Sequence, residues 1–187
     1  MSGITKTING AYGTSYSYND LARINNIANP NKISLGQVIG PSGGIPNVTT
    51  QVNADMKTNA GNPKVQDPFA FRSLVTGGGA WDLKNTNTYS SAKYKNGFIY
   101  HDPFKDQDIK IRSDAPGNMN FGFTGDAAWW AWPELLHQEA GKANMSDAAA
   151  RGQKISPLWV QCCNGDDPVD YKYIDYGIKL HSSGVLK

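Results

Sequence analysis

Glu134 is the residue whose type and neighbours best suit acid–base chemistry. It follows three tryptophans and a proline, and only one other glutamate, Glu139, occurs among the 16 acidic residues. Apolar neighbours raise the pKa of a carboxyl group, and a glycosidase needs such a protonated acid for the leaving sugar oxygen. We therefore predict Glu134 as the catalytic acid, with Glu139 as second choice. Trp129 and Trp130 would provide stacking surface for sugar rings. A glutamate favoured by the dipole at a helix start is the alternative.

Asp82 and Lys84 form a second group of polar side chains next to an aromatic ring. They follow Gly77-Gly78-Gly79, which predicts a loop, and stand directly after Trp81. Functional groups are often carried by loops on a rigid scaffold. Asp82 would be a second catalytic carboxylate that positions water, Lys84 would anchor a carboxylate or phosphate, and Trp81 would contact the substrate. A capping aspartate beside a surface lysine is the structural alternative.

The stretch 114–126 carries polar groups that suit substrate binding. Asn118, Asn120 and Thr124, with backbone amides near the glycines, would hydrogen-bond an N-acetyl group or a phosphate equally well. A tight turn followed by a helix cap would explain the same residues without a substrate.

Two further candidates belong to other chemistries. His101, with Lys84, would be the base and phosphate-stabilising pair of a metal-independent nuclease, although a lone histidine is more often structural. Asp166, Asp167 and Asp170 form an acidic group that would suit a cation. Their position around a proline is explained by helix capping. We therefore predict no metal and no cofactor, and keep Asp167 as a second-choice site residue.

The elements that must position these residues are mostly helical. Apolar spacing and capping signals predict helices at 18–27, 49–60, 67–75, 124–132, from 133, at 145–151 and from 167. Strands are predicted at 98–100 and 109–111, a third extended piece at 120–123, and loops at 34–46 and 114–118. The predicted fold class is mainly α (α+β): a single helical domain, lysozyme-like in one version, with a small central β-hairpin or sheet. Residues 1–48 would form a loop-rich N-terminal extension and residues 49–187 the catalytic domain.

Composition and charge argue against two classes of protein: those that bind nucleic acid through a basic surface and those that span a membrane. The net charge is only +2, and the 18 basic residues are spread along the chain, whereas phosphate-binding surfaces usually cluster them. No apolar run approaches the roughly 20 residues of a membrane helix, and the first ten residues lack the apolar core of a signal peptide. We expect a chain that stays in the cytosol or is secreted without a cleavable signal peptide.

Cys162 and Cys163 are the only two cysteines, and they are adjacent. Neighbouring Cα atoms lie about 3.8 Å apart, closer than the roughly 4.4–6.8 Å of most disulfides. We therefore predict two inert thiols.

Five segments form an ordered pattern along most of the chain. They are 53–60 (NADMKTNA), 74–84 (LVTGGGAWDLK), 118–128 (NMNFGFTGDAA), 135–141 with its Leu-Leu and Ala-Gly pairs, and 166–180, which runs from Asp-Asp-Pro-Val-Asp to Tyr-Gly-Ile-Lys-Leu. Together they resemble the bacterial polymorphic toxin domain called toxin 44, so residues 49–187 would be a toxin 44-like catalytic domain. Leu83 stands where the family usually has His, and Trp129-Trp130 where it usually has Gly and Phe. These departures indicate a remodelled cleft near the tryptophans.

The resemblance implies an antibacterial effector toxin that a secretion machine exports and an immunity protein neutralises. We predict a peptidoglycan-degrading, muramidase-like glycosidase that acts on the glycan strand in the periplasm of a target cell, because aromatic rings beside short polar side chains suit sugars. An RNase or DNase toxin acting in the target cytosol is one alternative, and only there would nucleic acid be the partner. A non-catalytic glycan-binding module is the other.

Overall fold

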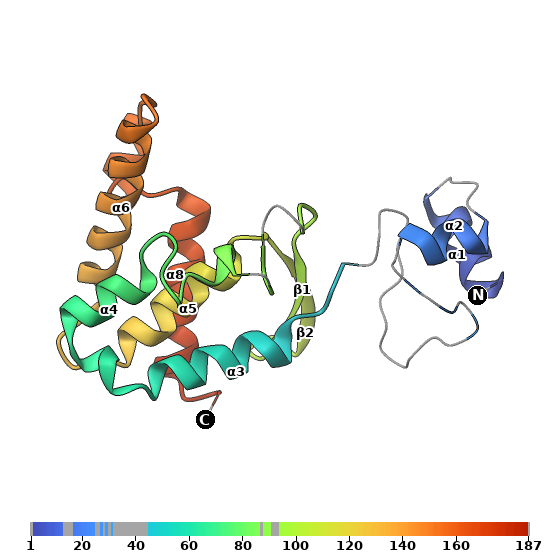
Figure 1. The fold of residues 1–187 in the computed structure, drawn as a ribbon, viewed down its shortest axis with the longest axis horizontal. Helices are drawn as coiled ribbons and strands as arrows, with labels where there is room; N and C mark the ends of the chain where they lie inside the picture. The colour runs from blue at the N-terminus through green and yellow to red at the C-terminus, as the bar shows by residue number, and fades with distance from the viewer. Residues whose placement is uncertain are drawn as a thin grey trace.

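The computed structural model of the protein is mostly helical with one small antiparallel sheet, which confirms the predicted α+β class (Figure 1). It describes residues 2–12, 17–24, 27, 29, 31, 45–86, 88–90 and 94–186. The elements are α1 (Ser2–Tyr12), α2 (Tyr18–Ile24), α3 (Thr49–Ala60), the 3-10 helix η1 (Pro63–Gln66), α4 (Pro68–Val75), the 3-10 helix η2 (Leu83–Asn85), β1 (Phe98–Asp102), β2 (Gln107–Ile111), α5 (Ala115–Asp126), α6 (Pro133–Ala150), α7 (Pro157–Cys163) and α8 (Pro168–Ser182). Of the helices in these described ranges, none combines the length and the apolar character that crossing a membrane requires. The lysozyme-like version of the fold stays a prediction.

The core is built around helices α5 and α8, which cross near the centre of Figure 1. Two glycines permit this close packing. A Cβ atom on Gly122 would overlap the carbonyl oxygen of Ile174, and one on Gly177 would overlap that of Met119. Any larger side chain would push the two helices apart, because protein interiors have no spare volume. Helix packing therefore explains these two glycines of the family-like segments.

Strands β1 and β2 form an antiparallel hairpin, as predicted. Phe98 pairs with Ile111, and both side chains are buried in the main core. Tyr100 of β1 is also buried, and its hydroxyl donates a hydrogen bond to Asn53 Oδ1 of α3 at 2.7 Å. The hairpin is thus fixed to α3 through both apolar packing and a partly buried hydrogen bond.

Helix α5 corrects the prediction for 114–126. The sequence predicts a loop at 114–118, an extended piece at 120–123 and a helix cap at 124–126, but the structure has one helix across all three. Glycine and asparagine are weak helix formers. Here α5 packs against both α3 and α8, and this burial outweighs the weak propensity. Pro116 lies in the first turn of α5, a position that suits proline.

The remaining helices match the predictions in part. Helices α3, α4 and α8 lie where the sequence predicts them, and Asp67 and Asp167 cap α4 and α8 as expected. Helix α6 is continuous where two helices are predicted. The separate helix predicted for 124–132 is wrong, because this stretch is the end of α5 followed by a turn.

Residues 1–48 contain more helix than predicted. Helix α2 agrees with the helix predicted for 18–27, but α1 was not predicted, and the two helices contact each other. The loop predicted for 34–46 lies almost wholly outside the described residues. The division of the chain at residue 48 stays a prediction.

Cys162 and Cys163 form a disulfide bond at the end of α7. The prediction of two inert thiols is therefore wrong. Their Cα atoms lie 3.8 Å apart, as a trans peptide requires, and the bond closes where α7 ends and the backbone turns left-handed at Asn164. Because it joins neighbours, the bond connects no separate segments of the fold.

Candidate functional site

Four aspartates gather where β2 ends and where α5 and α8 begin. This carboxylate cluster comprises Asp114, Asp166, Asp167 and Asp170. Arg112 lies among them, with its Nη2 2.5 Å from Asp114 Oδ2. Its Nη1 lies 3.4 Å from Asp167 Oδ2 and 3.7 Å from Asp170 Oδ1. One guanidinium group faces three carboxylates, so it does not neutralise the cluster by itself.

Capping at the start of α8 orients two of these aspartates. Asp167 is the N-cap residue, and its Oδ1 accepts a hydrogen bond from the amide of Val169 at 2.7 Å. Asp166 Oδ1 accepts a hydrogen bond from the amide of Asp167 at 2.9 Å. Gly165, with a φ of 92°, makes the turn that precedes them. The capping signal visible in the sequence therefore also builds the cluster.

Several buried polar atoms of this region have no hydrogen-bond partner. They are Asp114 Oδ1, Asp166 Oδ2, Asp170 Oδ1 and, one turn along α5 from Asp114, Asn118 Nδ2. Only one further side-chain atom of this kind, on His137, is found in the part of the chain that the structure describes. Such atoms cost free energy and are rare in native proteins. Their concentration here indicates a site that keeps them available for a ligand or a shared proton.

Burial and neighbouring charges bring two members of the cluster towards neutral titration. Burial, reinforced by the charge of Asp170, raises the pKa of Asp166 to about 7. Burial, reinforced by the charge of Asp114, raises the pKa of Asp170 to about 6. Buried carboxyls that repel one another retain a proton between them. The cluster can therefore both donate and accept a proton near pH 7.

Lys84 supplies a second positive charge to the cluster. It lies in η2, and its backbone and Cβ pack so closely on α5 that a Cβ on Gly117 would lie 3.4 Å from the Lys84 Cβ. Its charge lowers the pKa of both Asp166 and Asp170, against the larger effect of their burial.

Among the described residues, no group of three or more His, Cys, Asp or Glu side chains has the arrangement of a metal site.

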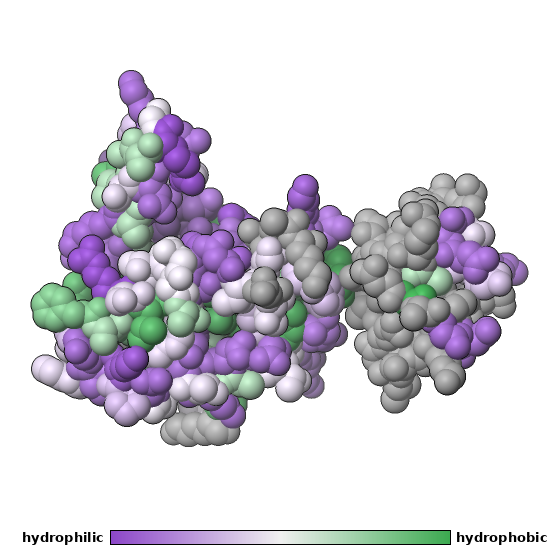
Figure 2. Space-filling view, in the orientation of Figure 1, coloured by the Kyte–Doolittle hydropathy of each residue, from purple (hydrophilic) through white to green (hydrophobic). Residues whose placement is uncertain are grey.

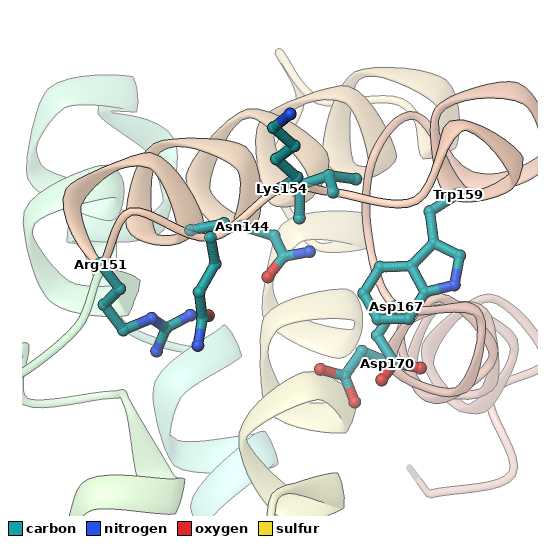
Figure 3. Close-up of a pocket in the computed structure, with 9 residues that line it drawn as sticks. Asn144, Arg151, Lys154, Trp159, Asp167 and Asp170 are labelled. Carbon is teal, nitrogen blue, oxygen red and sulfur yellow. The ribbon is translucent and has the colours of Figure 1, made fainter.

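A cleft of about 500 Å³ opens beside the cluster, between α6, α7 and the first turn of α8 (Figure 3). Its lining residues are Asn144, Ala148, Arg151, Gln153, Lys154, Ile155, Trp159, Asp167 and Asp170. Figure 3 shows the ring of Trp159 next to Asp167, with Asp170 below it and Arg151 at the other end of the cleft. A ligand in this cleft would meet two carboxylates and an aromatic ring.

Three of the residues predicted from the sequence come together here: Lys84, Asn118 and Asp167. The prediction missed Arg112, Asp114, Asp166, Asp170 and Trp159 as site residues. The segment 166–170 did carry a signal, since it was recognised as an acidic group. In the sequence, helix capping was enough to explain these aspartates. In the structure, the same segment both caps α8 and forms part of the carboxylate cluster.

Trp81 and Trp130 belong instead to an internal aromatic cluster with Phe71. The ring centroids of Phe71 and Trp81 lie 6.4 Å apart, and those of Phe71 and Trp130 5.5 Å apart. Trp81 is buried, and Trp130 Nε1 donates a hydrogen bond to the carbonyl oxygen of Val65 at 2.9 Å. These two rings contact protein rather than open a surface to a substrate.

Asp82, Asn120 and Thr124 are buried and hydrogen-bonded inside the protein. Asp82 Oδ2 accepts a hydrogen bond from the amide of Gly78 at 3.0 Å. Asn120 Nδ2 donates to the carbonyl oxygen of Trp81 at 3.0 Å, and Thr124 Oγ1 donates to that of Asn120 at 2.6 Å. Their contacts order the loop after α4 and the end of α5.

Glu134 lies exposed in the first turn of α6. It accepts a hydrogen bond of 3.5 Å from Gln138. The apolar shield predicted around it is absent, because Trp130 turns into the aromatic cluster and Trp129 is 82% exposed. Apolar residues do reach the surface over α4, as Figure 2 shows, where Phe69 is 85% exposed. The role of Glu134 as proton donor stays a prediction.

The second-choice residues Glu139 and His101 lie beside oppositely charged or hydrogen-bonding side chains near the surface. Glu139 Oε1 lies 2.6 Å from Lys142 Nζ on the same helix. His101 is on β1, and its ring nitrogens lie 3.3 Å from Asp106 and 3.2 Å from Asp108. Neither residue lines the cleft.

The fold and the cluster define a small, mainly helical α+β domain with a site suited to general acid–base chemistry. The sequence profile described as Bacterial toxin 44 matches residues 70–183, which is more than half of the chain. The chain therefore belongs to the bacterial toxin 44 family, and its domain is a toxin domain. No curated protein and no solved structure matches the chain significantly. The matched range contains the whole carboxylate cluster, Lys84 and the cleft.

Proposed function

We propose that the chain is an antibacterial effector that hydrolyses the glycan strands of peptidoglycan. The observation that carries the proposal is the position of Asp170, which lines the cleft, has a buried oxygen without a hydrogen-bond partner and has a pKa raised to about 6. A glycosidase requires such an acid beside a second carboxylate. Asp167 lines the same cleft and contacts the same nitrogen of Arg112.

In the proposed reaction, protonated Asp170 gives its proton to the glycosidic oxygen while the bond from that oxygen to the anomeric carbon breaks. Water adds to the anomeric carbon, and the carboxylate of Asp167 takes the proton that this water loses. The carboxylates then redistribute the proton, so one water is consumed for each bond cleaved. Asp114 would act as a positioning residue, because its charge adds to the effect of burial in raising the pKa of Asp170.

The sequence alone places the proton donor at Glu134, and the proposal now assigns it to Asp170. Glu134 is exposed, whereas Asp170 lines the cleft and has a buried carboxylate oxygen. Lys84 and Asn118 keep their predicted roles in modified form: Lys84 tunes the carboxylates, and Asn118 would hydrogen-bond the substrate. Trp159 replaces the predicted tryptophans as the ring against which a sugar would stack.

We place the target in the periplasm of a rival cell, where peptidoglycan is found. The proposal includes a component of a secretion machine and a cognate immunity protein as partners, because toxins of this kind require export and protection of the producer. A nuclease toxin acting in the target cytosol is the competing proposal, in which Lys84 and Arg112 would face a phosphate.

Purified protein incubated with dye-labelled cell walls tests the proposal. The intact chain should release soluble dye, and Asp170→Asn should lower the rate by about a hundredfold or more, as expected for loss of a general acid. Asp147→Asn is the matched control, because Asp147 is an exposed aspartate on α6, and it should leave the rate unchanged.

The same samples are incubated with RNA and with plasmid DNA. Degradation of either without release of dye would replace the proposal with the nuclease, and wall binding without turnover would leave only a binding module. Expression with and without an added signal peptide gives a second readout. Toxicity restricted to periplasmic expression supports wall hydrolysis, whereas toxicity in the cytosol contradicts it.

A further inference from the structure

Asn144 lies on the face of α6 that borders the cleft. It lines the cleft together with Ala148, one helical turn further along. One turn earlier, α6 packs directly on the backbone that leads into α8, because a Cβ atom on Gly141 would overlap the carbonyl oxygen of Asn164. This close packing holds Asn144 at a fixed position beside the turn that leads into the carboxylate cluster.

A hydrogen bond fixes the orientation of the Asn144 amide group. Its Nδ2 donates to the carbonyl oxygen of Gly165 at 2.9 Å. A carbonyl oxygen accepts hydrogen bonds and donates none, so the nitrogen end of the amide must face Gly165. The Oδ1 atom forms no hydrogen bond within the described part of the chain, and it is not one of the buried atoms without a partner. Because Asn144 lines the cleft, and its amide lies between Arg151 and the two aspartates in Figure 3, this oxygen is available to a ligand there.

The oxygen of Asn144 is one of several acceptors beside an aromatic ring. Asp167 and Asp170 contribute carboxylate oxygens to the same cleft, and the half-buried ring of Trp159 stands next to Asp167 (Figure 3). A sugar matches this arrangement, because its hydroxyl and acetamido N–H groups are donors and its ring has an apolar face. A phosphate would instead bring a negative charge towards two aspartates. This part of the cleft therefore suits a neutral glycan better than a nucleic acid.

We infer that Asn144 is a substrate-binding residue, whose amide oxygen accepts a hydrogen bond from a hydroxyl or acetamido N–H group of the sugar that stacks on Trp159. The identity of the ligand rests on the proposed glycan hydrolysis. The bond to Gly165 holds the amide in place before the substrate arrives, so little side-chain freedom is lost on binding.

Calorimetric titration with chitotetraose, a neutral tetramer of N-acetylglucosamine, tests this inference. The intact chain should bind the tetramer. Asn144→Ala should weaken binding about tenfold, as expected for the loss of one hydrogen bond to the ligand. Near-ultraviolet circular dichroism of the same samples shows that the variant is folded.

Asn144→Asp separates substrate binding from a purely structural role. Both variants lose the N–H group that donates to Gly165, but only the aspartate keeps an oxygen acceptor at the same position. Asn144→Asp should therefore bind chitotetraose within about threefold of the original chain, because a carboxylate accepts hydrogen bonds at least as well as an amide does. An effect transmitted only through the turn at Gly165 would weaken both variants equally.

Gln138→Ala is the matched control. Gln138 also carries an amide group on α6, but it is exposed and is not a lining residue of the cleft. Its substitution should leave the affinity unchanged. Unchanged affinity in Asn144→Ala, equal losses in Asn144→Ala and Asn144→Asp, a loss in Gln138→Ala, or no binding by the intact chain would overturn the inference.

Turnover separates this inference from the proposed function. On cell walls, Asn144→Ala should raise KM about tenfold and change kcat little, since the hydrogen bond is made equally in the ground and transition states. Binding of chitotetraose through Asn144 without wall hydrolysis would contradict the proposed function and leave the inference standing. Wall hydrolysis with an unchanged KM in Asn144→Ala would contradict the inference and leave the function standing.

Discussion

The two ends of helix α5 show how a structural cluster differs from a candidate site. The second half of the helix reaches the aromatic cluster, where Asn120 and Thr124 are buried and hydrogen-bonded to carbonyl oxygens. Its first turns reach the carboxylate cluster, where Asp114 Oδ1 and Asn118 Nδ2 are buried without such partners. Asn118, Asn120 and Thr124 all belong to the same family-like segment, 118–128. The unmet hydrogen bonds, rather than the residue types, distinguish the end that is open to chemistry.

This difference has a physical cause. A buried group that is satisfied inside the protein stabilises the fold, while a buried group without a partner destabilises it. The second arrangement persists where the surrounding structure holds it in place, which is typical of functional sites. Substitution of a hydrogen-bonded residue at the aromatic cluster should therefore lower stability. Substitution at the carboxylate cluster should instead lower activity or raise stability.

The largest expected effect concerns activity, and it compares Asp170 with Glu134. Asp170→Asn should reduce dye release from cell walls by about a hundredfold or more. Glu134→Gln should keep the rate within about twofold of the original, because this exposed side chain has no buried environment to make it an acid. Initial rates at saturating substrate measure both. A large loss in Glu134→Gln with full activity in Asp170→Asn would return the catalytic role to the tryptophan-rich segment.

The next effect concerns stability at the aromatic end. Asn120→Ala should lower the free energy of unfolding by about 2–3 kcal/mol, because it removes hydrogen bonds to Trp81 and to Asn59 and leaves their buried groups unpaired. Urea titration followed by tryptophan fluorescence measures this. The folded fraction should keep the rate of dye release from cell walls, and loss of that activity would show that the two ends of α5 are not independent.

Features of the fold that depend on residues close together in the sequence could be predicted from it. Features that depend on packing between distant segments could not. The helix starts at Asp67 and Asp167 were predictable because capping acts within three residues. Helix α5 was not, because its glycines and asparagines become helical only through packing against α3 and α8.

The candidate site was predicted less well than the fold for the same reason. Lys84, Arg112 and Asp170 are far apart in the sequence, and only the fold brings the two positive charges close enough to act on this carboxyl group. The tryptophans misled the prediction, because adjacency to Glu134 in the chain did not become shielding in space. Family resemblance identified the correct segments, but not which of their residues face the cleft.

The smallest expected effect is a gain in stability at the carboxylate cluster, which is opposite in sign to the loss expected at the aromatic cluster. The pKa of Asp166 is raised from 3.8 to about 7 in the folded protein. The native state therefore binds this proton more tightly than the unfolded state, and stability contributed by the protonated group is lost as the pH rises from about 4 to about 7. Asp166→Asn removes the charge, so it should match the original chain near pH 4 and exceed its unfolding free energy by roughly 1–2 kcal/mol at pH 8.

Urea titrations at both pH values measure the difference, with Asp147→Asn as the control that should show none. A gain that is equal at the two pH values would mean that charge burial at Asp166 is not the cause. Greater stability at pH 8 would identify Asp166 as a group whose buried charge the fold retains at a cost.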